Sequence, residues 1–132
     1  MAKLTEAMKQ MIATQQCFVG TVSPDGMPNV APKRSTRLFD DETLIFNEGT
    51  GRTTHSNLLS GSRVAIAVVN RDEMDGYRFV GTATVHQSGP VYEQAAAISV
   101  QSGRPAPRAA VTVAVEEIYS LKPGPTAGAR IG

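Results

Sequence analysis

The sequence predicts a mainly β protein, a small antiparallel barrel of about six strands with two or three short helices. Three observations indicate this class. Short apolar runs rich in β-branched residues recur along the chain, turn-forming residues separate the early runs, and the last run alternates apolar and polar residues. Because hairpin-type turns join the early strands, the sheet should be mainly antiparallel, and closing it fully or partly into a barrel removes exposed edges.

The composition suits one compact domain, residues 1–132, in which residues 120–132 form a tail rich in proline and glycine. Apolar residues make up 41% of the chain and charged residues 19%, an ordinary globular balance. The net charge of +1 does not predict recruitment of nucleic acid by bulk charge. The single cysteine, Cys17, favours a reducing, cytoplasmic setting, and no apolar run is long enough to span a membrane.

The first half of the chain predicts one helix and three strands. Residues 4–12 carry apolar side chains at helical spacing, and CFVGTVS, from Cys17, predicts a strand that ends in the turn SPDGMPN. A second strand follows from Asn29, and Pro32 predicts that it lies at an edge of the sheet, because proline cannot donate to a central ladder. After the turn DDE, TLIFN predicts a third strand.

The second half predicts two more helices and three more strands. A short helix stops at Gly61, and residues 63–70 are apolar at consecutive positions, which predicts a strand buried on both faces. Residues 77–86 alternate, with Tyr77 on the same face as the apolar positions that follow it. A helix begins near Pro90, and a long alternating strand covers AAVTVAVEEIYSL.

The segment NEGTGRTTHSNL, residues 47–58, has two interpretations. A helix beginning near Thr53 leaves backbone N–H groups unpaired in its first turn, which carries no carboxylate, and Thr53 can cap it. Gly49 and Gly51 allow close approach of a ligand, and Arg52 supplies a cation, so the segment favours a phosphate. The alternative is a capped surface helix with an exposed arginine.

A second basic segment, APKRSTR, places Lys33, Arg34 and Ser35 just after Pro32. If this strand neighbours TLIFN, its basic end faces the same anion; alternatively, it is a charged edge that prevents association between sheets. No cluster of histidine, cysteine and acidic residues has metal-ligand spacing, and no nucleophile or acid–base motif is present. Any chemistry is therefore expected to come from a bound cofactor, with the catalytic residues unknown.

The succession FVGTVSPDGMPNVAPKRS, DDETLIFNEGTGRTTHSNLLSGSRVAIAVV and GYRFVGTATV resembles the pyridoxamine 5'-phosphate oxidase-like FMN-binding split-barrel family, in particular its short FMN-binding members. The resemblance implies a six-stranded antiparallel split β-barrel with Greek-key connections, forming a homodimer with FMN at the subunit interface. The cofactor-binding positions that it implies are Pro32, Lys33, Arg34, Ser35, Phe46, Asn47, Gly51, Arg52, Thr53, Thr54, Asn57 and, from the strand of the partner subunit, Tyr77. Full oxidases carry Arg-Lys in the phosphate loop, whereas this chain has Arg52-Thr53, one cation fewer.

The resemblance implies an FMN-dependent oxidoreductase of unknown substrate that exchanges electrons with a small-molecule donor or acceptor, without a metal, nucleic acid or membrane partner. Two alternatives share the same binding residues: a non-catalytic FMN carrier or electron-transfer module, and a reductase that uses the deazaflavin F420. A third is a dimeric structural domain without a cofactor. Because the C-terminal segment does not match the basic substrate-binding end of the full oxidases, oxidation of pyridoxamine phosphate is not predicted.

Overall fold

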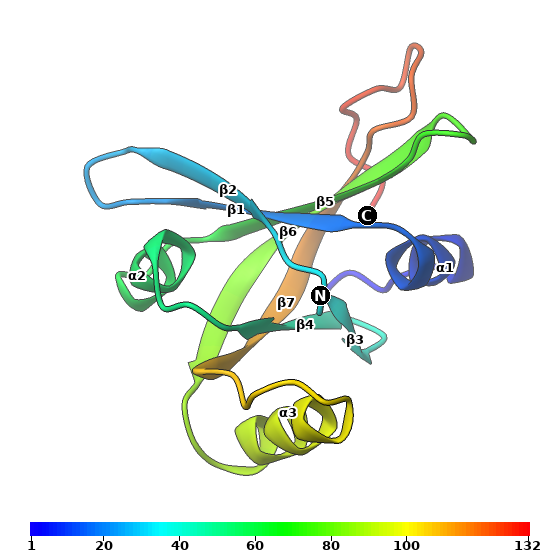
Figure 1. Ribbon diagram of the computed structural model, residues 1–132. Coiled ribbons are helices and arrows are strands. Elements are labelled where there is room, and N and C mark those ends of the chain that lie inside the picture. Colours follow the sequence, from blue (N-terminus) through cyan, green and yellow to red (C-terminus); the bar gives the residue numbers. More distant parts are fainter.

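A computed structural model describes all 132 residues. Seven strands form one antiparallel sheet in the order β2-β1-β5-β6-β7-β4-β3, with three helices around it (Figure 1). The elements in chain order are α1 (Glu6–Thr14), β1 (Cys17–Val22), β2 (Pro28–Pro32), β3 (Arg37–Asp40), β4 (Thr43–Glu48), α2 (Thr53–Leu59), β5 (Val64–Asn70), β6 (Asp75–His86), α3 (Pro90–Gln101) and β7 (Ala109–Ser120).

The predicted architecture is confirmed, whereas the predicted number of six strands is wrong. The additional strand is β3, whose four residues pair only with β4. The basic segment between Pro32 and Arg37 leaves the sheet, and the chain re-enters it at the opposite edge. The run RLFD is too short and too polar at its ends to be distinguished from a turn in the sequence.

The two edge strands of the sheet, β2 and β3, are joined by residues 33–36. No backbone ladder connects β2 to β3, so the barrel is split between them. Pro32 is the last residue of β2, which confirms its predicted place in an edge strand. The split therefore lies where the most basic part of the chain crosses from one edge to the other.

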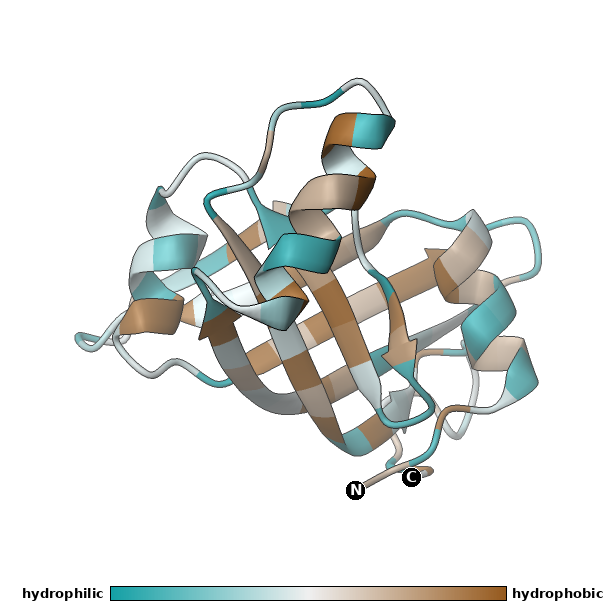
Figure 2. Cartoon of the chain, turned by 90° about the horizontal axis from the view of Figure 1, so that it is seen from below, coloured by the Kyte–Doolittle hydropathy of each residue, from teal (hydrophilic) through white to brown (hydrophobic).

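The inside of the curved sheet holds a core of 17 buried apolar residues. Helices α1 and α2 and strands β1, β4, β5, β6 and β7 contribute to this core. Figure 2 shows hydrophobic residues along the central strands. Helix α1, which begins at the Thr5 cap, buries Met8, Met11 and Ile12 in this core, as its spacing predicted. Cys17 is also buried, and burial raises the pKa of its thiol to about 11. None of the three helices has the length and apolar character needed to cross a bilayer.

Strand β5 is buried on one face only, so the prediction of two buried faces is wrong within this chain. Val64, Ile66 and Val68 enter the core, whereas Ala65 and Ala67 are half-exposed and Val69 is exposed. Ala67 pairs with the exposed Phe18 of β1, and Ala65 pairs with Gly20, whose other partner is the exposed Val30. The consecutive apolar residues of β5 therefore build a core face and an apolar outer face. The apolar members of the outer face are Phe18, Val30, Ala65, Ala67 and Val80, and Arg78, which pairs with Ala67, lies beside them.

The long strands β6 and β7 approach each other closely at Gly81, beside an irregularity in their register. A Cβ at this position would lie 1.9 Å from the carbonyl oxygen of Ala114, so only glycine fits. After β7 the tail folds back without forming a helix or strand of its own. A single bridge joins Tyr119 to Arg130, and the amide of Ile131 donates to the carbonyl of Ile118 at 2.8 Å.

Candidate functional site

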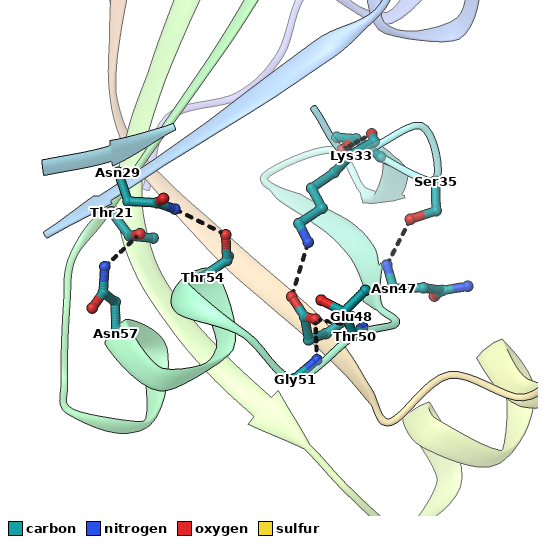
Figure 3. Close-up of polar contacts among 11 residues, drawn as sticks. Thr21, Asn29, Lys33, Ser35, Asn47, Glu48, Thr50, Gly51, Thr54 and Asn57 are labelled. Atoms are coloured by element: carbon teal, nitrogen blue, oxygen red, sulfur yellow. Dashed lines mark hydrogen bonds and ion pairs between the residues drawn. The ribbon is translucent and has the colours of Figure 1, made fainter. Parts of the chain in front are cut away.

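The glycine-containing loop, residues 49–52, connects β4 to α2 beside the basic segment 33–36 (Figure 3). Gly51 has a φ of +71°, and the helix starts directly after it with Arg52, not Thr53, at the cap position. The prediction that Thr53 caps the helix is therefore wrong: Thr53 already has helical geometry, and no side chain caps the first turn. The first turn contains no acidic residue, and Gly61, with a φ of +90°, ends the helix as predicted.

Glu48, the last residue of β4, holds the centre of this region (Figure 3). One carboxylate oxygen accepts hydrogen bonds from the amides of Thr50, at 3.0 Å, and Gly51, at 2.9 Å. The other oxygen accepts from the ammonium of Lys33 at 2.9 Å. Complete burial opposes ionisation of Glu48, but the ammonium and the two amides outweigh this effect and lower its pKa. A carboxylate of the chain itself thus occupies part of the predicted anion-binding loop.

Thr54 and Asn57 are buried and fasten α2 to the sheet. The amide group of Asn29 donates to the Thr54 hydroxyl at 3.1 Å, and the amide group of Asn57 donates to the hydroxyl of Thr21 at 3.1 Å (Figure 3). Both residues therefore place the helix relative to β1 and β2. On the same stretch, the side chains of Arg52 and Thr53 are exposed and free to meet a ligand.

The expectation that the strand before Lys33 neighbours TLIFN in the sheet is wrong, because β2 and β4 are not paired; residues 33–36, which cross from one edge of the sheet to the other, nevertheless bring Ser35 to Asn47. The backbone amide of Asn47 donates to the Ser35 hydroxyl at 2.8 Å (Figure 3). Arg37, the first residue of β3, donates to the carbonyl of Ser35 at 2.7 Å and to the side-chain oxygen of Asn47 at 3.5 Å. Partial burial lowers the pKa of the Arg37 guanidinium. Arg37, the last residue of the predicted basic segment APKRSTR, therefore holds this segment against β4, although it was not among the predicted cofactor-binding positions.

A pocket of about 520 Å³ opens between this basic segment and the end of α3. Four of its lining residues are cationic, namely Lys33, Arg34, Arg37 and Arg104, and none is acidic. Lys33 is paired with Glu48, whereas the three arginines form no ion pair. The remaining lining residues are Pro32, Ser35, Thr36, Asn47, Gly49, Ile98, Ser99, Ser102, Pro105, Ala106 and Pro107. The concentration of unpaired positive charge is suited to an anionic or electron-rich ligand.

Arg108 supplies a further cation beside the loop, and no sequence pattern indicated it. A Cβ on Gly51 would lie 2.8 Å from both Cδ and Nε of Arg108, so the arginine side chain packs directly on the loop backbone. The amide of Arg108 donates to the carbonyl of Glu48 at 2.8 Å, which fixes the start of β7 against the end of β4. Arg108 forms no ion pair, so its charge is unpaired beside the loop.

Phe46 and Tyr77 have their side chains directed to the core. Phe46 is completely buried, so within one chain the structure does not present this predicted cofactor-binding residue to a ligand. The ring of Tyr77 lies against that of Phe79, with 6.1 Å between the centroids, and the strand register places Tyr77 beside Val68 and Ser120. Within one chain the structure does not bring Tyr77 to the pocket. Its neighbour Arg78 is on the opposite face of β6, with its guanidinium 4.4 Å from the centre of the Tyr119 ring.

The structure thus combines a split antiparallel barrel with a basic pocket near a glycine-containing loop. The profile of the family described as pyridoxamine 5'-phosphate oxidase matches residues 4–122, and the chain therefore belongs to this family. This confirms the resemblance found in the sequence, including its mainly β split-barrel fold.

Two proteins are similar over almost the whole chain. HupZ from group A Streptococcus is 42% identical in sequence; its structure superposes with a TM-score of 0.86 and covers 95% of this chain and 99% of HupZ. An uncharacterised protein from Methanocaldococcus jannaschii is 33% identical over 130 residues, 96% of this chain and 86% of its own length.

At lower identity the same fold occurs in proteins whose names refer to different cofactors. An FMN-binding protein from Syntrophomonas wolfei, 16% identical, has a TM-score of 0.70 over 88% of this chain and 84% of its own. An F420 reductase, 19% identical, has a TM-score of 0.67 over 87% of this chain and 98% of its own. These two similarities concern the fold alone.

Proposed function

We propose that the protein binds FMN and functions as a flavin-dependent oxidoreductase for a small-molecule donor or acceptor. The observation that carries the proposal is the pocket beside the split. Its wall contains Pro32, Lys33, Arg34, Ser35 and Asn47, which the family resemblance had assigned to the flavin, and no carboxylate. Its volume of about 520 Å³ suits a cofactor-sized ligand.

Different residues of the site would bind the phosphate and the ring system of the cofactor. Arg52 and Arg108, with the hydroxyl of Thr53, stand at the loop and are suited to the phosphate. Arg34 and Arg37 line the pocket and are suited to the electron-rich edge of the ring system. When bound, the flavin supplies hydride or electron transfer, and a fixed cation beside it favours its reduced, anionic form.

The outer face of the sheet supports the proposal that two copies associate. Phe18 is 44% exposed and Val30 is 69% exposed, and Ala65 and Ala67 lie between them and Val80. Small and apolar residues on this sheet face allow the same face of a second copy to approach closely. In such a homodimer the outward-facing Arg78, rather than the inward-facing Tyr77, would point towards the partner subunit.

The test is the ligand that the purified protein carries. We expect a yellow protein from which mass spectrometry of the released ligand identifies FMN. Release of F420 would establish the deazaflavin alternative, and failure to bind either compound after its addition would contradict the proposal. Turnover separates the remaining possibilities, because a reductase should bleach its flavin when NAD(P)H is added, whereas an electron carrier should require a second, reducing protein.

A further inference from the structure

Glu48 is the only charged residue that is buried in this chain, and it lies between the glycine-containing loop and the basic pocket. We propose that Glu48 determines specificity by limiting the affinity of the site for anionic groups. It occupies two loop amides and neutralises Lys33, which a ligand phosphate would otherwise use. The inference rests on the proposed flavin function and concerns how strongly the protein distinguishes FMN from riboflavin, its counterpart without phosphate.

The hydrogen bonds of Glu48 show which donor groups of the loop are not free to bind a ligand. The amides of Thr50 and Gly51 are adjacent donors in a loop, the arrangement that binds anions in many proteins. Here both donate to the same carboxylate oxygen, at 3.0 and 2.9 Å. A ligand phosphate can use these amides only by displacing that oxygen, and the displaced carboxylate would then remain buried and unsatisfied.

The charge of Glu48 acts over a longer range than its hydrogen bonds. The side chain of Lys33 is only 14% exposed and that of Glu48 only 1%, so solvent screens neither charge effectively. Since the two charges cancel, a ligand meets the three unpaired arginines of the pocket and not a fourth cation. Replacing Glu48 by glutamine preserves its shape and one acceptor but restores the positive charge of Lys33 to the site.

The loop-holding role of Glu48 predicts a different result from the electrostatic role. If Glu48 only maintained the loop, the substitution Glu48→Gln would weaken the binding of FMN, or affect both flavins equally. If Glu48 limits anion affinity, the same substitution strengthens the binding of FMN and leaves riboflavin unchanged. The ratio of the dissociation constants for FMN and riboflavin therefore separates the two roles. General damage to the pocket would change both constants by the same factor and leave their ratio unchanged.

The experiment measures dissociation constants for FMN and riboflavin from the quenching of flavin fluorescence, with wild-type protein, Glu48→Gln and the control Glu116→Gln. Glu116 pairs with Arg63 on the surface, so its replacement changes the net charge equally without touching the loop. We expect Glu48→Gln to bind FMN about tenfold more tightly, with a steeper salt dependence, while riboflavin binding changes by less than about twofold. The control should change neither value.

The opposite substitution keeps the proposal testable if Glu48→Gln does not fold. In Lys33→Gln the charge of Glu48 is no longer neutralised, so the preference for FMN over riboflavin should decrease, also by about tenfold. An unchanged preference in either folded variant, or a lower one in Glu48→Gln, would overturn the inference while leaving FMN binding by the wild type intact. Wild-type protein that binds neither flavin would remove the proposed function together with it.

Discussion

Single side chains around the loop decide how the ligand's phosphate is held. Arg52 is exposed at the start of α2, and Arg108 packs on Gly51 from the start of β7. We expect Arg52→Ala and Arg108→Ala each to weaken FMN binding by about 1.5–3 kcal/mol, the value of a hydrogen bond to a charged group. Arg71, in an exposed turn, provides the control, and titration of each variant with FMN provides the measurement. Unchanged affinity in Arg108→Ala would show that Arg108 does not contact the ligand.

The carboxylate of Glu48 makes stability depend on pH in the acidic range. Its pKa in the folded protein is lower than the usual value of 4.5, because Lys33 and two amides stabilise the charged form despite burial. A lowered pKa contributes stability above the usual value, and this contribution is lost as the pH falls through the folded-state value. Denaturant unfolding of wild type and Glu48→Gln should therefore differ clearly at pH 7 and converge below pH about 4.5. A difference that stays constant down to pH 3 would contradict this assignment.

At the scale of the element, the pair β6 and β7 depends on one glycine. In Gly81→Ala the new methyl group would meet the Ala114 carbonyl at 1.9 Å, so the strands must separate or slip. We expect a loss of about 3 kcal/mol in the free energy of unfolding, measured by denaturant titration. Gly49→Ala is the matched control, because a Cβ at Gly49 meets nothing within 4 Å. Equal stability of the two variants would show that the strands can move apart without cost.

Elements whose residues follow a clear period could be predicted, and those defined by distant contacts could not. The spacing of apolar residues located α1, β6 and β7, whereas β3 forms only because β4 offers it an edge. The sequence showed that β5 is apolar but not that one of its faces remains uncovered within the chain.

In the candidate site, too, residues in local sequence patterns could be predicted, whereas residues brought in by distant contacts could not. Local patterns identified Lys33, Ser35 and Arg52, which belong to contiguous basic or glycine-containing stretches. Arg104 and Arg108 belong to a loop that is distant in sequence and reaches the site only through the folding of α3 onto β7. The importance of Glu48 could not be recognised, because an acid next to an expected phosphate loop has a role only when its burial and its partners are known.

For the whole molecule, the outer face of the sheet predicts the oligomeric state. In Phe18→Asp a charge replaces a ring that is 44% exposed in the single chain, so the variant should fold but should not associate. We expect a dimer for the wild type and a monomer with weakened FMN binding for the variant, as measured by sedimentation equilibrium and flavin titration. Val100→Asp, at a position that is 58% exposed on α3, should remain dimeric. A wild-type monomer would contradict the proposed interface.

The split between β2 and β3 also has a consequence for motion. Because no ladder of backbone hydrogen bonds joins these strands, the barrel can widen there while the rest of the sheet stays paired. Lys33, which follows β2 at the split, lines the pocket, so transient widening of the split would let a broad planar ring enter and leave without unfolding of the core. We expect amides of β2 and β3 to exchange with deuterium much faster than those of β6, and FMN to slow this exchange selectively. Residues 33–36 would then both line the pocket and move to admit the ligand.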